Sequence, residues 1–182
     1  MDLKELNIEL RISARRAGLC DRWFNEWDLN SDHQTLIDKY KKSIDFVMEN
    51  NFPSNEFIVS NIDKELLEKN NIYVNTEFYV NNPQSDCVVL DSSGKFVFSG
   101  FSVRDIYVNG ASDIEIGAKD HAKIYVTVYG CADVHLVQRG LASIRVYKNN
   151  DCNISFEGNV KVHEKDGEYF ECLYFIIIFV SK

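Results

Sequence analysis

A ten-residue repeat over residues 111–160 constrains the fold of this chain more than any other feature of its sequence. Its units read ASDIEIGAKD, HAKIYVTVYG, CADVHLVQRG, LASIRVYKNN and DCNISFEGNV. The fourth and sixth positions are always apolar, as in Ile114 and Ile116, and the second position is always small. Side chains two apart on a strand share one face, so each unit predicts a short strand whose apolar pair turns inward. A fixed short period is typical of a solenoid built from stacked rungs.

Earlier apolar pairs extend the same pattern toward the N-terminus. These pairs are Val88/Leu90, Phe96/Phe98 and Ile106/Val108. Two successive steps between pairs span 18 to 20 residues, which predicts two strands in each coil of a narrow β-helix. An antiparallel meander is the alternative, because ten-residue spacing also suits hairpins. The small residue at one fixed position favours the solenoid, since tight stacking of coils requires it and hairpin turns do not.

The segment before the strands carries helical patterns. The first 20 residues fit either a strand or a helix, and Gly18 favours a helix that stops there. The best-supported helix spans 32–50, where Ser31 and Gln34 match a capping box and one apolar stripe follows.

Two further short helices are expected at 54–61 and 63–69. We therefore predict an α+β chain with three parts, which are an α-helical head at 1–71, a β-solenoid at 72–164, and a C-terminal cap strand or tail at 165–182. The head would cap the first coil, because repeat proteins need covered ends that hide apolar rungs and open strand edges.

The formal net charge of −8 argues against a protein that binds polyanions directly. DNA and RNA binders usually present a basic surface, so we expect no direct DNA binding. Residues 1–98 hold 17 acids and 11 bases, whereas residues 99–164 hold 8 and 7. The repeat is therefore nearly neutral, and most of the acidic excess precedes it. An acidic chain of this kind suits competition with nucleic acid for a basic partner.

The cysteines and the apolar run near the C-terminus bear on location. Five cysteines without a C-x-x-C pair, and a start without the apolar run of a secretion signal, predict a reducing cytoplasm. The run at 173–180 holds eight apolar residues, and a membrane span needs about 20. We therefore expect no membrane contact and interpret the run as a buried strand, with an oligomer contact or a poorly ordered tail as alternatives.

No catalytic or metal-binding motif is present in the sequence. It holds no P-loop, G-x-G-x-x-G, G-x-S-x-G or H-E-x-x-H. His121, Cys131 and His135 have a metal-like linear spacing, but the repeat places His135 at an outward position apart from the other two. Asp113 and Glu115 are carboxylates of the kind that glycosidases pair, but they share one strand face without a cleft. We therefore predict no enzyme, no cofactor and no metal site.

The outward positions sort into two unlike faces if two strands form one coil. One sheet would present an aromatic and basic set: Tyr107, Lys123, Tyr125, Arg145 and Tyr147. The opposite sheet would present an acidic set: Asp113, Glu115, Asp133, His135 and Glu157. Tyrosine and arginine are frequent at the energetic centres of interfaces, and the same mixture can stack on RNA. The first set is therefore the candidate binding site, and an ordinary solvated surface is the alternative.

Two stretches near the N-terminus, GLCDRWFNEWDL and LIDKYKKSIDFVMENNFPSNEFI, precede FSVRDIYV and the short A-x-I-x-V units. In this order they resemble a group of small uncharacterised bacterial and mobile-element proteins with a helical head and a short-repeat β-solenoid. The resemblance covers most of residues 14–164 and carries over no catalytic residue. The rod is also similar in kind to pentapeptide-repeat proteins, some of which imitate DNA and block DNA-handling enzymes. Its ten-residue period, β-branched strands and near neutrality depart from theirs and argue against DNA mimicry by the rod.

These features predict a non-enzymatic protein-binding module, an inhibitor or adaptor that acts on a larger nucleic-acid-handling protein. The sharpest version is an anti-CRISPR or anti-defence inhibitor of an RNA-guided nuclease, with that nuclease and its guide RNA as the partner. A structural phage or surface assembly protein is the alternative, with a homo-oligomer formed through 173–180. A carbohydrate-active enzyme is a third and less favoured interpretation.

Overall fold

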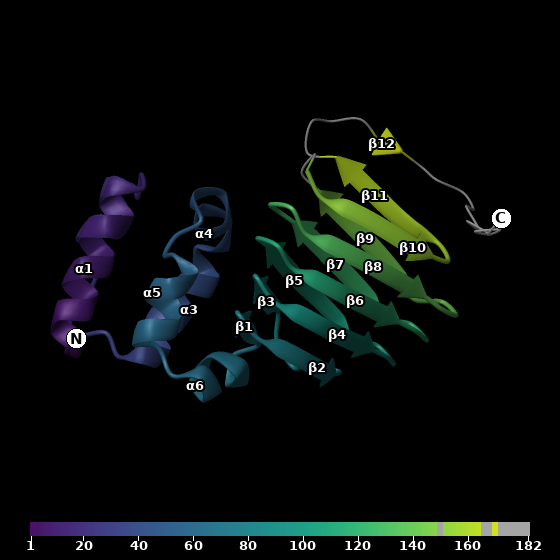
Figure 1. Ribbon diagram of the computed structural model, residues 1–182, viewed down its shortest axis with the longest axis horizontal. Coiled ribbons are helices and arrows are strands. Elements are labelled where there is room, and N and C mark those ends of the chain that lie inside the picture. Colours follow the sequence, from purple (N-terminus) through teal and green to yellow (C-terminus); the bar gives the residue numbers. More distant parts are fainter. Residues whose placement is uncertain (149–150, 165–168, 171–182) are drawn as a thin grey trace. The chain divides into compact units, whose positions relative to one another are not determined.

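The chain divides into two compact units, Met1–Val74 and Asn75–Lys182, in a computed structural model that describes residues 1–148, 151–164 and 169–170 (Figure 1). Helices dominate the first unit and a β-solenoid forms the second, which confirms the predicted α+β class. Most of the predicted C-terminal part, including the apolar run at 173–180, lies outside the described residues. None of the helices in the described parts of the chain has the length and apolar character needed to cross a membrane.

The helices of the first unit begin and end at clear local signals. Their bounds are α1 (Leu3–Arg16), α2 (Asp21–Asn25), α3 (His33–Lys42), α4 (Ile44–Asn50), α5 (Asn55–Asn61) and α6 (Lys64–Lys69), and the short strand β1 (Ile72–Val74) follows. Asp2 and Glu5 form a capping box at the start of α1, and Gly18 follows its end with a φ of 103°. Ser54 and Asp63 cap α5 and α6 through their side chains, at the predicted starts of both helices.

Two details of the predicted helix at 32–50 are wrong. Its N-cap is Asp32, whose carboxylate accepts a hydrogen bond from the Thr35 nitrogen over 2.8 Å, and not Ser31. The helix also breaks at Ser43, so that α3 and α4 are separate. The Ser43 hydroxyl donates to the carbonyl of Lys39 over 2.9 Å. Serine side chains that bond the preceding turn in this way bend or interrupt helices.

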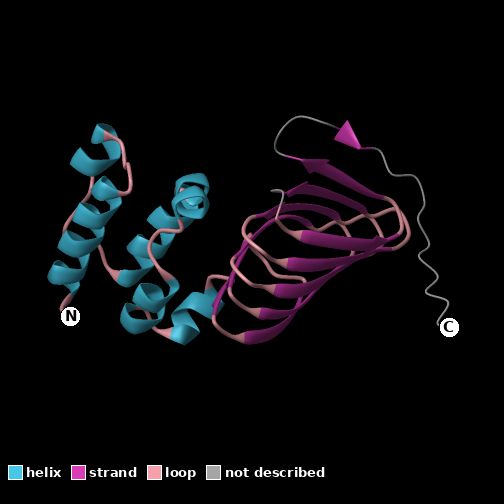
Figure 2. Ribbon diagram, turned by 45° about the horizontal axis from the view of Figure 1, so that its top comes forward, coloured by secondary structure: helices cyan, strands magenta, loops and turns pink. Residues whose placement is uncertain are grey.

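The second unit winds into coils of two strands each, as Figure 2 shows. Its strands are β2 (Glu77–Asn81), β3 (Cys87–Leu90), β4 (Ser93–Phe98), β5 (Val103–Asn109), β6 (Asp113–Ala118), β7 (Lys123–Val128), β8 (Asp133–Gln138), β9 (Ser143–Lys148), β10 (Asn153–Glu157), β11 (Val160–Glu164) and β12 (Tyr169–Phe170). One sheet of this unit runs β3-β5-β7-β9-β11-β12, and the other runs β10-β8-β6-β4-β2.

Strands β6, β7 and β8 of the repeat each pair in parallel with the strand twenty residues later. Ile124 of β7 lies opposite Ile144 of β9, and Val134 of β8 lies opposite Ile154 of β10. Consecutive strands therefore belong to opposite sheets, which confirms two strands per coil and excludes the antiparallel meander. Ladder partners share a face, so each inward position becomes a column of apolar side chains; Ile144, for example, is fully buried.

The small second position of each repeat lies buried at a corner of the coil. Ala122 and Ala132 have no exposed surface. The backbone carbonyl of this position accepts a hydrogen bond from the next coil, as from the Ser143 nitrogen to Ala122 over 2.8 Å. A larger side chain here would push the coils apart, which explains why only small residues recur.

The tenth position adopts the left-handed backbone conformation in the first three repeats, at Asp120, Gly130 and Gly140. Gly130 has a φ of 69°, and a Cβ added there would lie 2.9 Å from the backbone nitrogen of Gly110 in the preceding coil. Asp120 takes the same conformation with a φ of 61°. Its carboxylate accepts a hydrogen bond from the Gly100 nitrogen over 3.0 Å. Aspartate adopts the left-handed conformation more readily than most residues do. Its hydrogen bond to Gly100 joins this corner to the corner of the preceding coil.

The predicted inward pair Val88/Leu90 is wrong by one residue. Cys87 lies opposite Ile106 and Val88 lies opposite Tyr107, so Cys87 and Val89 continue the interior columns. The offset between β3 and β5 is 19 residues instead of twenty, and a shift of one residue exchanges the two faces of a strand. All four residues of β3 are buried.

We predict that Ala132→Leu destabilises the solenoid by about 1–3 kcal/mol, because it overpacks a closed corner. Ala111→Leu is the matched control, since Ala111 stands one position earlier in its repeat and is exposed. Urea denaturation of both variants and of the parent chain measures the difference. Equal stability of Ala132→Leu and Ala111→Leu would show that the second position does not limit coil stacking.

Candidate protein-binding face of the solenoid

The predicted binding residues lie in three neighbouring strands of one sheet. Tyr107 belongs to β5, Lys123 and Tyr125 belong to β7, and Arg145 and Tyr147 belong to β9. Each alternates with a buried interior residue, so each side chain points away from the core. We name the outward side of β5, β7, β9 and β11 the odd face, and the outward side of β4, β6, β8 and β10 the even face.

The register assembles these side chains into columns on the odd face. Tyr125 lies opposite Arg145 on one side and Asp105 on the other, and Arg145 continues to Lys161 in β11. Burial raises the pKa of Asp105, with a further contribution from the charge of Asp86. The column therefore runs from a carboxylate, through a tyrosine, to two cations, with neighbours about 4.8 Å apart.

A second column contains the other two predicted tyrosines. Tyr107 lies opposite Thr127, and Thr127 lies opposite Tyr147. The Tyr147 ring stacks on His163 of β11 with a centroid distance of 5.2 Å, and 41% of the Tyr147 residue surface remains exposed. The stacking fixes the ring orientation, so that an exposed aromatic surface is held in place on the sheet.

Sequence reasoning missed a row of large side chains at the corner that precedes these strands. Phe101 is 83% exposed and Leu141 is 76% exposed, and Val103, two residues after Phe101, is half-exposed. The Phe101 ring stacks on His121 in parallel, with centroids 4.9 Å apart. The first position of the repeat carries Phe101, His121 and Leu141 at 20-residue intervals, and this spacing was the signal that could have identified the row.

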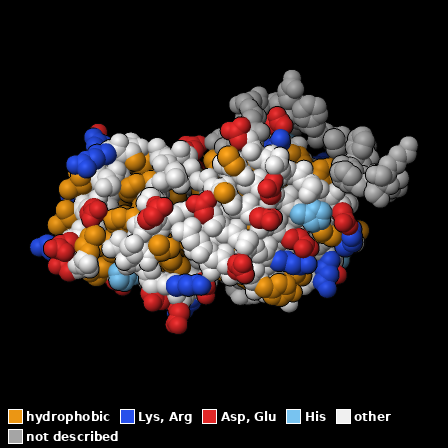
Figure 3. Space-filling view, viewed as in Figure 1, with side chains coloured by type: hydrophobic (Ala, Val, Ile, Leu, Met, Phe, Trp, Pro, Cys, Tyr) orange, Lys and Arg blue, Asp and Glu red, His pale blue; other side chains and the backbone are white. Residues whose placement is uncertain are grey.

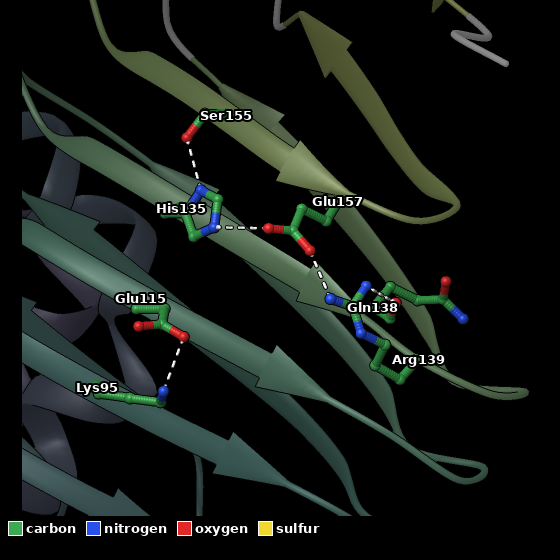
Figure 4. A network of polar contacts seen from close by, with 7 residues as sticks. All are labelled: Lys95, Glu115, His135, Gln138, Arg139, Ser155 and Glu157. Carbon is green, nitrogen blue, oxygen red and sulfur yellow. Dashed lines mark hydrogen bonds and ion pairs between the residues drawn. The ribbon is translucent and has the colours of Figure 1, made fainter. Parts of the chain in front are cut away.

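Two acidic residues of the even face, Glu115 and Glu157, are paired with cations from nearby rungs. Lys95 Nζ lies 2.8 Å from Glu115 Oε1, and Arg139 contacts Glu157 (Figure 4). The hydrogen bond to Glu115 raises the pKa of Lys95, and the hydrogen bond from Arg139 lowers the pKa of Glu157. The five predicted residues do share one sheet, in β6, β8 and β10. Sequence reasoning did not count Lys95 and Arg139, which pair with two of the acids on this face.

Further contacts on the even face follow the same register. His135 Nδ1 and Ser155 Oγ are 2.9 Å apart, and His135 Nε2 lies 3.9 Å from Glu157 Oε1. Asn153 donates to Asp133 over 2.8 Å. On the side of the solenoid that Figure 3 shows, acidic and basic side chains both occur and are interspersed. Several charged groups of the even face, including Glu115 and Glu157, are therefore engaged by contacts within it.

The residues considered for chemistry do not converge. Asp113 and Glu115 both lie in β6, and Glu115 is already ion-paired. His121 precedes β7 and Cys131 precedes β8, so the two stand beside different sheets. In the parts of the chain that the structure describes, no group of three or more His, Cys, Asp or Glu is placed to hold a metal ion.

We predict that Arg139→Gln raises the pKa of Glu157 toward the ordinary carboxyl value, because the charge that stabilises the carboxylate is lost. Lys95→Gln is the control, since it removes a cation from the same face that pairs with Glu115. Titration of the side-chain carboxyl carbons by NMR reads the Glu157 pKa in both variants. An unchanged pKa in Arg139→Gln would contradict the pairing drawn in Figure 4.

Comparisons of the chain with known protein families, curated proteins and solved structures found no match. The resemblance to mobile-element proteins therefore stays a prediction, and the function is argued from the two faces of the solenoid.

Proposed function

We propose that the protein is a non-enzymatic binding module whose odd face docks on a larger protein. Support comes from the columns that the register builds, which hold Tyr125 beside Arg145 and align Tyr107 with Tyr147 across β7. Tyrosine and arginine supply a large share of binding energy at protein interfaces. The exposed row at the corner adds apolar surface next to them, led by Phe101.

The charges of the odd face also favour it over the even face. Lys123 and Arg145 are exposed, and neither forms an ion pair with any residue that the structure describes. The even-face cations Lys95 and Arg139 are both paired with carboxylates. Unpaired cations are available to a partner's acidic groups, whereas paired ones must first lose a contact.

The backbone of the odd face is preorganised for binding. Its strands are held by ladders on both sides, so a partner would order few additional groups, and rigid surfaces lose less entropy on association. Tyr147 is further held by its stack on His163. A flat and rigid aromatic surface is suited to another folded protein.

The narrower proposal concerns the kind of partner. Two unpaired cations among tyrosines suit a nucleic-acid-handling protein that presents acidic groups or bound RNA, because guanidinium and aromatic groups stack on bases and pair with phosphates. An inhibitor or adaptor role follows for a chain that contributes contact but no catalytic group. The four cysteines in the described part of the chain, Cys20, Cys87, Cys131 and Cys152, form no disulfide, which fits the cytoplasm as the proposed location.

We predict that Tyr125→Ala combined with Arg145→Ala weakens partner binding roughly tenfold or more, because both residues stand at the centre of the odd face. The measurement is capture of proteins from a lysate of the organism that encodes the chain, with and without ribonuclease, followed by titration of the captured protein. Loss of capture after ribonuclease would assign the contact to RNA bound by the partner.

The matched control is Tyr79→Ala combined with Arg139→Ala, which removes one tyrosine from β2 of the opposite sheet and one arginine directly after β8 of that sheet. Tyr79 and Arg139 are both exposed. A protein captured by the parent chain and the control, but not by the odd-face variant, supports the proposal. Equal capture by all three chains, or self-association as the sole binding event, would contradict it.

A further inference from the structure

The helical unit contains a partly open apolar cavity that the proposed role of the solenoid does not use. Residues from α1 to β1 line the cavity, and its surface is almost wholly apolar. Much of the lining is aromatic and includes Trp23, Trp27, Phe46, Phe52 and Phe57. Ligand cavities are typically of this kind, with a few polar groups that orient the bound molecule.

Lys39 of α3 brings a cation to this lining. Its side chain is half-buried, and Nζ donates to Ser31 Oγ over 2.6 Å and lies 4.9 Å from the Trp27 ring centroid. Burial lowers the pKa of Lys39, and the charge of Asp28 opposes that effect. No carboxylate in the described part of the chain forms an ion pair with Lys39. A half-buried ammonium without an ionic partner favours an anion beside it.

Tyr40, the next residue of α3, also lines the cavity. Burial raises the pKa of Tyr40, so its hydroxyl stays protonated and able to donate a hydrogen bond. The structure shows no hydrogen bond from this hydroxyl to any described residue. The other polar lining residue, Ser43, already donates to the backbone of α3. The polar groups available to a ligand therefore lie together on the C-terminal half of α3.

We propose that this cavity binds a small amphipathic carboxylate of the fatty-acid type. Its apolar chain would lie among the aromatic side chains, and its carboxylate would meet Lys39 and Tyr40. A neutral apolar molecule would fill the cavity but leave the ammonium without an ionic partner. An inorganic anion would pair with Lys39 but leave the apolar lining uncovered. The site therefore selects a ligand that carries both parts.

Tryptophan fluorescence measures this binding directly, because both tryptophans of the chain line the cavity. The full chain is titrated with decanoate, below the concentration at which decanoate forms micelles, and separately with 1-decanol. We expect a saturable change with both probes and roughly tenfold or more tighter binding of decanoate, since a charge-assisted hydrogen bond is lost with the alcohol.

The decisive variant is Lys39→Met, which keeps the aliphatic stem and removes the charge. It should bind 1-decanol as the parent chain does and lose the preference for decanoate. Lys42→Met is the matched control, because Lys42 is exposed on the same helix and lies 5.5 Å from the Trp23 ring centroid. It should keep the preference.

Either of two results would overturn the inference. One is the absence of a saturable fluorescence change with decanoate in the parent chain. The other is a preference for decanoate that survives in Lys39→Met. Neither result depends on capture of a protein partner by the odd face, so failure of this inference and failure of the proposed function are distinguishable.

Discussion

The parallel register that joins strands twenty residues apart, from β4 to β10, determines which way the side chains of these strands point. Ladder partners in a parallel sheet share a face, so a residue type that recurs at this spacing becomes a column. In the interior the register places Ile124 against Ile144, and outside it places Tyr125 against Arg145. A single constraint therefore produces both the apolar core and the arrangement of the surface from which function is argued.

How far the sequence predicts the fold depends on how regular this register is. The interior positions Ile114 and Ile116 are readily identified because their period is constant. At β3 the offset of 19 residues turns Cys87 inward in place of Val88, and no feature of the repeat signals that change. In the helical unit, the break at Ser43 arises from its own hydroxyl bonding the backbone, which an apolar stripe does not reveal.

The surface residues, like the fold, could be predicted only where they follow the regular alternation of the strands. Strand positions such as Tyr125 follow from alternation, whereas the exposed row that begins at Phe101 lies at a corner where alternation does not apply. The pairing of Lys95 with Glu115 joins a strand before the repeat to one within it, so a survey of repeat units omits it. The cavity beside Lys39 has no sequence signature, because the aromatic residues that line it have the helical spacing of an ordinary core.

The left-handed corner at the tenth position determines which insertions and duplications this fold tolerates during evolution. Insertion of one residue just before Gly130 would put a residue other than glycine at this positive-φ position, where a side chain is strained. It would also shift the following strand by one residue, so that its inward-pointing and outward-pointing side chains would exchange faces. Duplication of a whole twenty-residue coil would keep every column and lengthen each face by about 4.8 Å. Exposed residues such as Arg145 can meanwhile be replaced without disturbing the core. The interior columns that hold the coils together are thus independent of the exposed residues. Related chains can therefore keep the same coils and bind different partners.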